Sequence, residues 1–229
     1  MRLLTLVLAR AGSKRCPDKN KRLLGDKPLI EWTLDVALSL HELGDCLVST
    51  DDLQIQAISQ RKGALAPWLR PSPLATDNAT SVDAALHALQ WYESEVDAVD
   101  GIVLLQPTSP FRTRSSLLEA YELMLDDAID SVVSVVEEPD LNGWCFELKD
   151  GLLIPPQSDT KTVRSQDLVQ MIRPSGSFYF TKSSLFKAYH SFTVGRVAPI
   201  FINSRVEAID IDDEYDFSVA EAFCGNFKS

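Results

Sequence analysis

Short runs of consecutive apolar residues alternate along this chain with segments in which apolar residues recur at helical spacing. Apolar runs at residues 3–9, 46–48, 102–105 and 131–136 have the length and content of buried strands. Helices are predicted at residues 29–40, 81–92 and 115–126, with another that ends at Arg61 and is capped by Thr50 or Asp51. A short strand is predicted at residues 63–67. The alternation predicts an α/β domain with a mostly parallel sheet, whose ligands gather beyond the carboxyl ends of the strands.

The pattern changes after residue 137. Residues 138–171 contain several prolines and glycines, with two short apolar runs at 144–148 and 152–154 about a turn. This pattern predicts a hairpin that leaves the main sheet, and such arms commonly bury their apolar face on another subunit. Strands at 176–180 and 196–201 and a closing helix at 214–223 follow. Residues 1–229 are therefore expected to form a single domain, with 138–171 inserted as a dimerisation arm.

Composition narrows the class of protein. The chain has 229 residues, 45% of them hydrophobic, and a formal net charge of -11. Nucleic acid is therefore not an expected partner, because nucleic-acid binding needs a basic face. The four cysteines form no C-x-x-C pair, no secretory segment is evident, and the first apolar run is too short to span a membrane. These features predict a cytoplasmic protein with reduced thiols and no membrane partner.

Basic residues cluster at the start of the chain. Eight of the 22 lysines and arginines lie within the first 27 residues, opposed there only by Asp18 and Asp26: Arg2, Arg10, Lys14, Arg15, Lys19, Lys21, Arg22 and Lys27. A loop of flexible backbone and clustered cations after a buried strand suits a polyphosphate, although a solvated basic loop would have the same composition. The sequence has no G-x-x-x-x-G-K-[ST] run, so a Walker-type loop is not predicted.

Acidic and apolar residues alternate near the end of the chain, in EAIDIDD at residues 207–213. Alternation predicts a strand with Asp210 and Asp212 on one face. Two carboxylates at that spacing suit Mg²⁺, which prefers oxygen ligands and usually keeps waters and substrate phosphates in its shell. The alternative is that Asp212 or Asp213 only caps the closing helix.

Four stretches resemble the sugar-acid cytidylyltransferases, and among them the N-acylneuraminate type. They are ARAGSKRCPDKN with LLGDKPLI at residues 9–30, RPSPLATDNATS at 70–81, LQPTSP at 105–110 and DIDDEYDFSVAE at 210–221. The resemblance implies a three-layer fold like that of the nucleotide-diphospho-sugar transferases. It also implies transfer of CMP from CTP to the anomeric hydroxyl of a sugar acid, with N-acetylneuraminate as the first expectation, and a homodimer formed through the arm.

The resemblance also implies roles for individual residues. Arg10, Lys19, Gln106 and Asp210 would be catalytic, and Asp210 and Asp212 would hold Mg²⁺. The nucleotide would be bound by Ala9, Arg10, Gly12, Ser13, Lys14, Arg15, Lys19, Asn20, Arg70, Ala79 and Ser81. The sugar would be bound by Gln106, Thr108, Ser109, Arg164, Arg173, Ser175 and Tyr179.

The chain departs from the family pattern on the sugar side. The arm lysine has no counterpart at residues 140–144, an arginine sits one position early at Arg164, and Ser175 stands where the family has asparagine. The acceptor could therefore also be a legionaminic, pseudaminic or Kdo-like acid, although the loop from Lys14 to Asn20 follows the sialic type. An alternative from another class is a dimeric nucleotide-binding module without catalysis.

Overall fold

The computed structural model describes residues 1–76, 78–139, 147–149, 152–154 and 170–225. Arg164 and most of the expected arm lie outside the described residues. Two short strands of the arm are described, β7 (Glu147–Lys149) and β8 (Leu152–Ile154), and they pair antiparallel as a separate two-stranded sheet, as the hairpin prediction requires. No helix in the described ranges has the length and apolar content that crossing a membrane requires.

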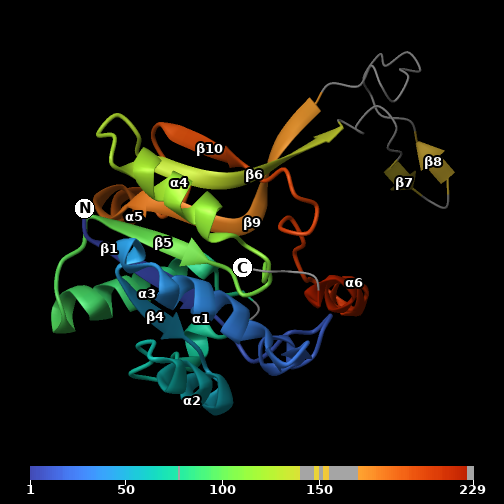
Figure 1. Ribbon diagram of the computed structural model, residues 1–229, viewed down its shortest axis with the longest axis horizontal. Helices are drawn as coiled ribbons and strands as arrows, with labels where there is room; N and C mark the ends of the chain where they lie inside the picture. The colour runs from blue at the N-terminus through green and yellow to red at the C-terminus, as the bar shows by residue number, and fades with distance from the viewer. Residues whose placement is uncertain (77, 140–146, 150–151, 155–169, 226–229) are drawn as a thin grey trace.

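A six-stranded sheet runs through the centre of the molecule in the order β10-β6-β9-β5-β1-β4 (Figure 1). Five strands are parallel, and β9 runs antiparallel between β5 and β6. The mostly parallel α/β prediction is therefore confirmed. The strands are β1 (Leu3–Leu8), β4 (Asp45–Ser49), β5 (Gly101–Leu105), β6 (Ser131–Pro139), β9 (Gln170–Lys182) and β10 (Val197–Phe201).

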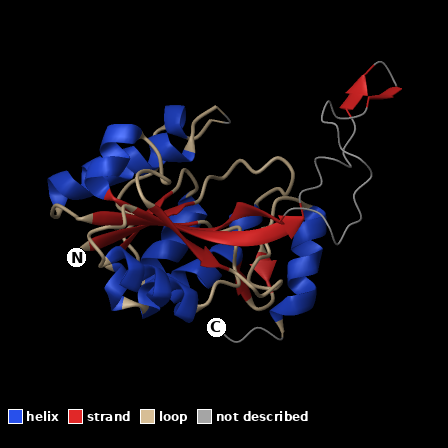
Figure 2. Ribbon diagram, turned by 90° about the horizontal axis from the view of Figure 1, so that it is seen from above, coloured by secondary structure: helices blue, strands red, loops and turns tan. Residues whose placement is uncertain are grey.

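Helices cover both faces of the sheet, which gives three layers (Figure 2). Leu3 and Val7 of β1 face a core shared with α1 (Leu29–Ser39), α2 (Leu53–Lys62) and α4 (Arg114–Met124). Leu4 and Leu6 face the other way, toward α3 (Ser81–Glu95) and α5 (Ser183–Tyr189). A strand buried on both faces is apolar at every position, which explains the unbroken run at residues 3–9.

A third, smaller core joins the two ends of the chain beside the sheet. The segment after β1 forms a short 3-10 helix, η1 (Lys19–Lys21), and a hairpin of β2 (Leu23–Leu24) and β3 (Lys27–Pro28). Cys16 and Leu24 of this segment are buried against Phe217 of α6 (Glu214–Cys224) and Ile211 just before it. This packing holds the basic loop next to the acidic segment.

Three local predictions were wrong. Asp52 caps α2, not Thr50 or Asp51, by accepting from the backbone N–H groups of Gln54 and Ile55. Residues 63–67 form no strand and contribute only an isolated bridge from Leu65 to β4. Residues 207–213 form a turn and an extended segment without a strand ladder.

Candidate active site

A cavity of about 630 Å³ lies at the carboxyl ends of β1 and β5. Its size lies within the range of small-molecule sites, about 300–1,000 Å³. Residues predicted for the nucleotide, the metal and the acceptor meet in this cavity. They are Arg10, Ser13, Lys14, Arg15, Lys19, Asn20, Arg70, Ala79, Ser81, Gln106, Thr108, Asp210 and Asp212.

The basic loop after β1 forms one wall. Its backbone is held from both sides, because the Ala11 N–H donates to the Asp51 carboxylate at 2.9 Å and the Asn20 amide donates to the Arg10 carbonyl at 3.2 Å. Ala9 is fully buried, with its N–H bonded to the Ser49 carbonyl, and does not line the cavity. The loop is thus fixed before any ligand binds, with cationic side chains directed at one space.

Arg70 also lines the cavity. Its side chain is 7% exposed and donates to the Ser49 hydroxyl at 2.9 Å and to the Ser49 carbonyl. Burial lowers the pKa of Arg70, and the nearby Asp51 carboxylate opposes that effect. Because Arg70 is buried and bonded to Ser49, it is held in the wall of the cavity and not on a surface loop. Ala79 and Ser81 line the same side.

Asp210 and Asp212 line another side of the cavity. The segment is fixed by the Ile211 N–H, which donates to the Thr108 carbonyl at 2.8 Å. Burial raises the pKa of Asp210, and the nearby Asp212 carboxylate adds to the rise, while a hydrogen bond from Thr108 opposes it. Asp213 supplies the cap of α6, so capping does not account for Asp210 or Asp212.

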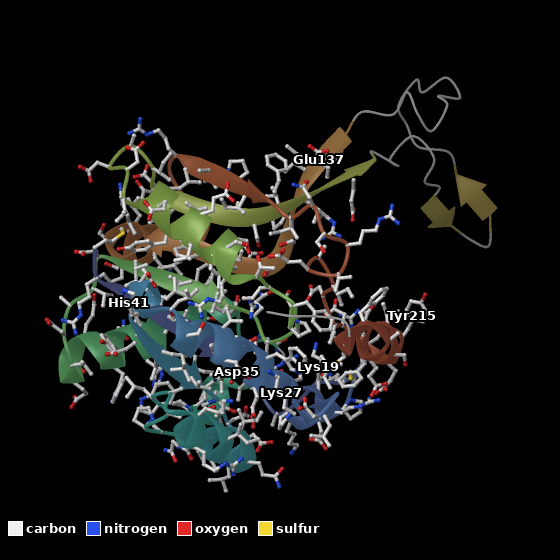
Figure 3. All side chains as sticks on the ribbon, viewed as in Figure 1. Lys19, Lys27, Asp35, His41, Glu137 and Tyr215 are labelled. Atoms are coloured by element: carbon white, nitrogen blue, oxygen red, sulfur yellow. The ribbon has the colours of Figure 1, made fainter. Side chains whose placement is uncertain are left out.

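Lys19 lies beside α6 (Figure 3), close enough to Asp210 and Asp212 for both carboxylates to act on its charge. Its ammonium donates to the Ile211 carbonyl at 2.5 Å, and its side chain is 8% exposed. Burial lowers the pKa of Lys19, while Asp212 and Asp210 oppose that effect. Arg15 also reaches Asp212, at 2.9 Å. The cations of the loop and the carboxylates of the C-terminal segment therefore form one charge cluster.

The acidic pair offers oxygen ligands of the kind that Mg²⁺ prefers. Asp210 Oδ1 is buried and has no hydrogen-bond partner among the described residues. Burial raises the pKa of Asp210 and disfavours an uncompensated negative charge there. Within the described ranges no group of three or more His, Cys, Asp or Glu side chains is gathered as a metal cage. Mg²⁺ at phosphate-transfer sites commonly uses one or two carboxylates plus substrate phosphates. The residues present fit that ion.

Gln106 directly follows β5 and lines the cavity beside Gly176. Gly176 has φ +85, and a Cβ built on it would lie 3.0 Å from Asp210 Oδ2 and 3.2 Å from Gln106 Oε1. The position arises from an irregularity of the sheet: Val133 pairs with Tyr179 but Val135 pairs with Pro174, so β9 carries extra residues there. Only glycine allows the two side chains to approach this backbone.

Several residues predicted for the sugar do not line the cavity. Ser109 is buried at 1% exposure, and Tyr179 packs in the core against Phe192. Ser175 is buried, and its hydroxyl donates to the Ser134 hydroxyl at 2.7 Å. Gly12, predicted for the nucleotide, also lies outside the lining, with open space around it.

Arg173 lines a second cavity of about 490 Å³, together with Phe201 and Arg205, and pairs with Glu138 at 2.5 Å. Its pKa is raised, chiefly by this partner and in smaller part by Asp210. The sugar side is thus the part of the prediction that the cavity bears out least.

The sequence analysis missed two positioning residues. Asp51 was considered only as a helix cap, but its carboxylate accepts the Ala11 N–H. Its position directly after a strand, at the sheet edge where the basic loop lies, could have indicated this role. Arg112, two residues after the LQPTSP run, is fully buried behind Gln106. Nothing in the sequence distinguishes it from an exposed arginine.

Comparison with known proteins agrees with this geometry. The model of the family described as Cytidylyltransferase matches residues 4–192. The chain is 35% identical to the CMP-N,N'-diacetyllegionaminic acid synthase of Legionella pneumophila, over 96% of this chain and 95% of that one. It is 32% identical to the N-acylneuraminate cytidylyltransferase of Escherichia coli O18:K1:H7, over 96% of this chain but 51% of that one.

Solved structures show the same fold. The structure of CMP:2-keto-3-deoxy-manno-octonic acid synthetase complexed with CTP superposes with a TM-score of 0.71 at 14% identity, over 99% of both chains. The 4-diphosphocytidyl-2C-methyl-D-erythritol synthase of Anaerococcus prevotii superposes with a TM-score of 0.65 at 13% identity, over 98% of this chain and 99% of that one. The chain belongs to the cytidylyltransferase family, and within it to the CMP-sugar-acid synthetases.

Proposed function

We propose that this chain transfers the cytidylyl group of CTP to the anomeric hydroxyl of a nine-carbon sugar acid and releases pyrophosphate. The observation that carries the proposal is the single cavity in which the basic loop, Arg70, the Asp210–Asp212 pair and Gln106 converge. Catalysis of phosphoryl-type transfer consists mainly of positioning and charge stabilisation, and these residues supply both.

The nucleotide binds between Arg70 and the basic loop. Arg70 and Asn20 contact the base, because Arg70 is held by the Ser49 hydroxyl and carbonyl and Asn20 by the Arg10 carbonyl. Lys14, Arg15 and Lys19 surround the triphosphate and neutralise charge that grows on the leaving pyrophosphate. Since Lys19 is already fixed on the Ile211 carbonyl, its ammonium needs little reorganisation during the reaction.

Mg²⁺, when bound, would be held by Asp210 and Asp212 and would neutralise charge at the α-phosphate and the leaving group. Gln106 orients the acceptor, because its amide lies next to Asp210 across Gly176. The acceptor hydroxyl is thereby placed on the same side of the cavity as the α-phosphate. Asp210, in its carboxylate form, is positioned to accept the proton of that hydroxyl, and burial raises its pKa, which makes the carboxylate a stronger base.

Two acceptors are the first to test. The relative matched over nearly its whole length is named for N,N'-diacetyllegionaminate, while the relatives named for N-acylneuraminate are spanned to about half their length. We therefore propose N,N'-diacetyllegionaminate ahead of N-acetylneuraminate, which the sequence motifs alone favoured.

The protein is further proposed to act as a homodimer. Met171 and Ile172 at the outer end of β9 are 48% and 56% exposed, and Phe201 of β10 is 40% exposed nearby in the sheet. Exposed apolar side chains at the end of a sheet favour burial on a second copy. Light scattering after gel filtration tests this: Ile172→Lys should shift the mass from dimer to monomer, and a monomeric parent protein would refute it.

The activity is tested by pyrophosphate release from CTP with Mg²⁺ and each acid separately: N,N'-diacetyllegionaminate, N-acetylneuraminate, pseudaminate and Kdo. We expect release with one of the nine-carbon acids and none without an acceptor. Release with Kdo alone would refute the acceptor class. Absence of release with every acid, while CTP still binds, would favour a nucleotide-binding module without catalysis.

A further inference from the structure

Arg112 is a fully buried cation behind the wall of the cavity. Buried arginines usually pair with a carboxylate, because an uncompensated charge is costly in the protein interior. Here the guanidinium donates instead to neutral oxygens: the Thr33 hydroxyl at 2.7 Å, the Gln106 carbonyl at 2.5 Å and the Ser177 carbonyl at 2.9 Å. Burial lowers the pKa of Arg112 to about 9, although Glu207 and Asp210 oppose the fall from a distance.

The Gln106 and Ser177 carbonyls belong to two different segments of the chain. Gln106 directly follows β5, and Ser177 follows Gly176 in the irregular part of β9. One nitrogen of Arg112, Nη2, donates to both. The backbones that carry Gln106 and Gly176 are therefore joined through a single guanidinium group.

The turn that follows Gln106 and ends at Arg112 also contacts the segment that carries Asp210. Thr108, two residues after Gln106, bonds to Asp210 through its hydroxyl and accepts the Ile211 N–H at its carbonyl. A shift of the Gln106 carbonyl would thus move the turn that holds Asp210. The nucleotide side has separate anchors, since Arg70 is held by Ser49 and the basic loop by Asp51.

We propose that Arg112 is a positioning residue for the acceptor half of the transfer, which holds Gln106 and the Gly176 backbone in register with Asp210. The inference rests on the proposed function, because it assigns the acceptor to the Gln106 side. This role of Arg112 requires the planar guanidinium and not only a positive charge. A lysine ammonium is shorter and cannot reach the Thr33 hydroxyl and the Gln106 and Ser177 carbonyls with the same geometry.

If Arg112 has this role, its replacement should impair use of the sugar acid but not binding of CTP. In Arg112→Lys the KM for the sugar acid should rise and kcat should fall, with a combined loss of about 100-fold in kcat/KM, the scale of a displacement near 1 Å at a reacting centre. The affinity for CTP, measured by calorimetry without Mg²⁺, should stay within about twofold, because none of the contacts that Arg112 makes with the described residues reaches Arg70 or the basic loop. The matched control is Arg114→Lys, at an exposed position in the first turn of α4.

The experiment measures turnover, CTP affinity and amide hydrogen exchange in the parent protein, Arg112→Lys and Arg114→Lys. Faster exchange confined to residues 106–109 and 175–178 of Arg112→Lys, with the kinetic split, supports the proposal. Unchanged exchange and kinetics, or equal losses toward CTP and the acid, would overturn it. If Arg112→Lys does not fold, Thr33→Val, which removes one acceptor of the same guanidinium, should show the same split in weaker form, and its absence there would overturn it.

Failure of the proposed function is a separate result. If the parent protein turns over no acid, the reaction assignment fails. The exchange data on residues 106–109 and 175–178 then decide alone whether Arg112 holds these segments together.

Discussion

Replacing Gly176 by alanine should disable the site while leaving most of the fold intact. The residue has φ +85, and an added Cβ would lie 3.0 Å from Asp210 Oδ2 and 3.2 Å from Gln106 Oε1. Both distances are shorter than ordinary van der Waals contact, so one or both side chains must move by a few tenths of an ångström. The left-handed backbone conformation adds strain of about 1–2 kcal/mol for alanine.

Gly63 provides a matched control. It has φ +97 at the end of α2, but nothing lies within 4 Å of a Cβ built there. Gly63→Ala and Gly176→Ala should therefore share the backbone strain, which for a chain of this size lowers Tm by roughly 2–8 °C. Only Gly176→Ala displaces Asp210 and Gln106.

The assay is steady-state pyrophosphate release, with thermal unfolding measured on the same samples. Gly176→Ala should lose about 10- to 100-fold in kcat/KM for the acceptor, which corresponds to about 1.4–2.7 kcal/mol of transition-state stabilisation. Gly63→Ala should keep the parent value at temperatures well below Tm. Parent-like turnover of Gly176→Ala would refute the close approach of Asp210 and Gln106, and equal losses in both variants would attribute the effect to strain alone.

Three further predictions concern the Mg²⁺ ligands, the contact with the nucleotide base and the pH dependence of stability. Asp212→Asn should raise the Mg²⁺ concentration for half-maximal turnover by roughly tenfold or more, whereas Asp213→Asn, which still caps α6, should not; an unchanged Mg²⁺ requirement would refute the metal assignment. Arg70→Lys should raise the KM for CTP about tenfold, because a charged hydrogen-bonding fork is lost, and an unchanged KM would exclude contact with the base. The pKa of Asp52 is lowered despite burial, chiefly by its hydrogen bond with Lys21, so its charge stabilises the fold above the ordinary carboxylate pKa and ceases to do so as pH falls through the lowered value. Asp52→Asn should therefore lower the Tm at pH 7 and converge with the parent at acid pH; a difference that persists unchanged at low pH would contradict the ion-pair explanation.

Local chemistry made much of the site predictable. The basic loop is continuous in sequence and follows an unmistakable buried strand, so its position at the carboxyl edge of the sheet follows from the α/β pattern. Arg70 was placed by resemblance and the Asp210–Asp212 pair by its alternating pattern as well as by resemblance, and the cavity contains all three.

The expected strand at residues 207–213 failed for a physical reason. Alternation of apolar and acidic residues indicates only that alternate side chains are buried. Ile211 is buried in the small core with α6 and the basic loop, and its N–H bonds to a turn carbonyl instead of a neighbouring strand. An extended segment packed in this way has the same sequence pattern as a strand.

The position of Ser175 could not be predicted from sequence because it depends on strand register. Ser175 lies in the irregular pairing of β6 with β9, where its hydroxyl bonds to Ser134, 41 residues away in the chain. Burial of Arg112 likewise results from contacts with three separate segments. Neither a sheet irregularity nor a buried cation has a local sequence signal.

The central claim is that one cavity joins CTP, the acidic pair and the acceptor for transfer of CMP. Phosphorus NMR of the reaction of CTP, Mg²⁺ and N,N'-diacetyllegionaminate or N-acetylneuraminate tests it most directly, with Asp210→Asn alongside. The account predicts a new phosphodiester signal and an equal amount of pyrophosphate, both dependent on the acid and both lost in Asp210→Asn. Consumption of CTP without a phosphodiester product, or parent-like product formation by Asp210→Asn, would contradict it.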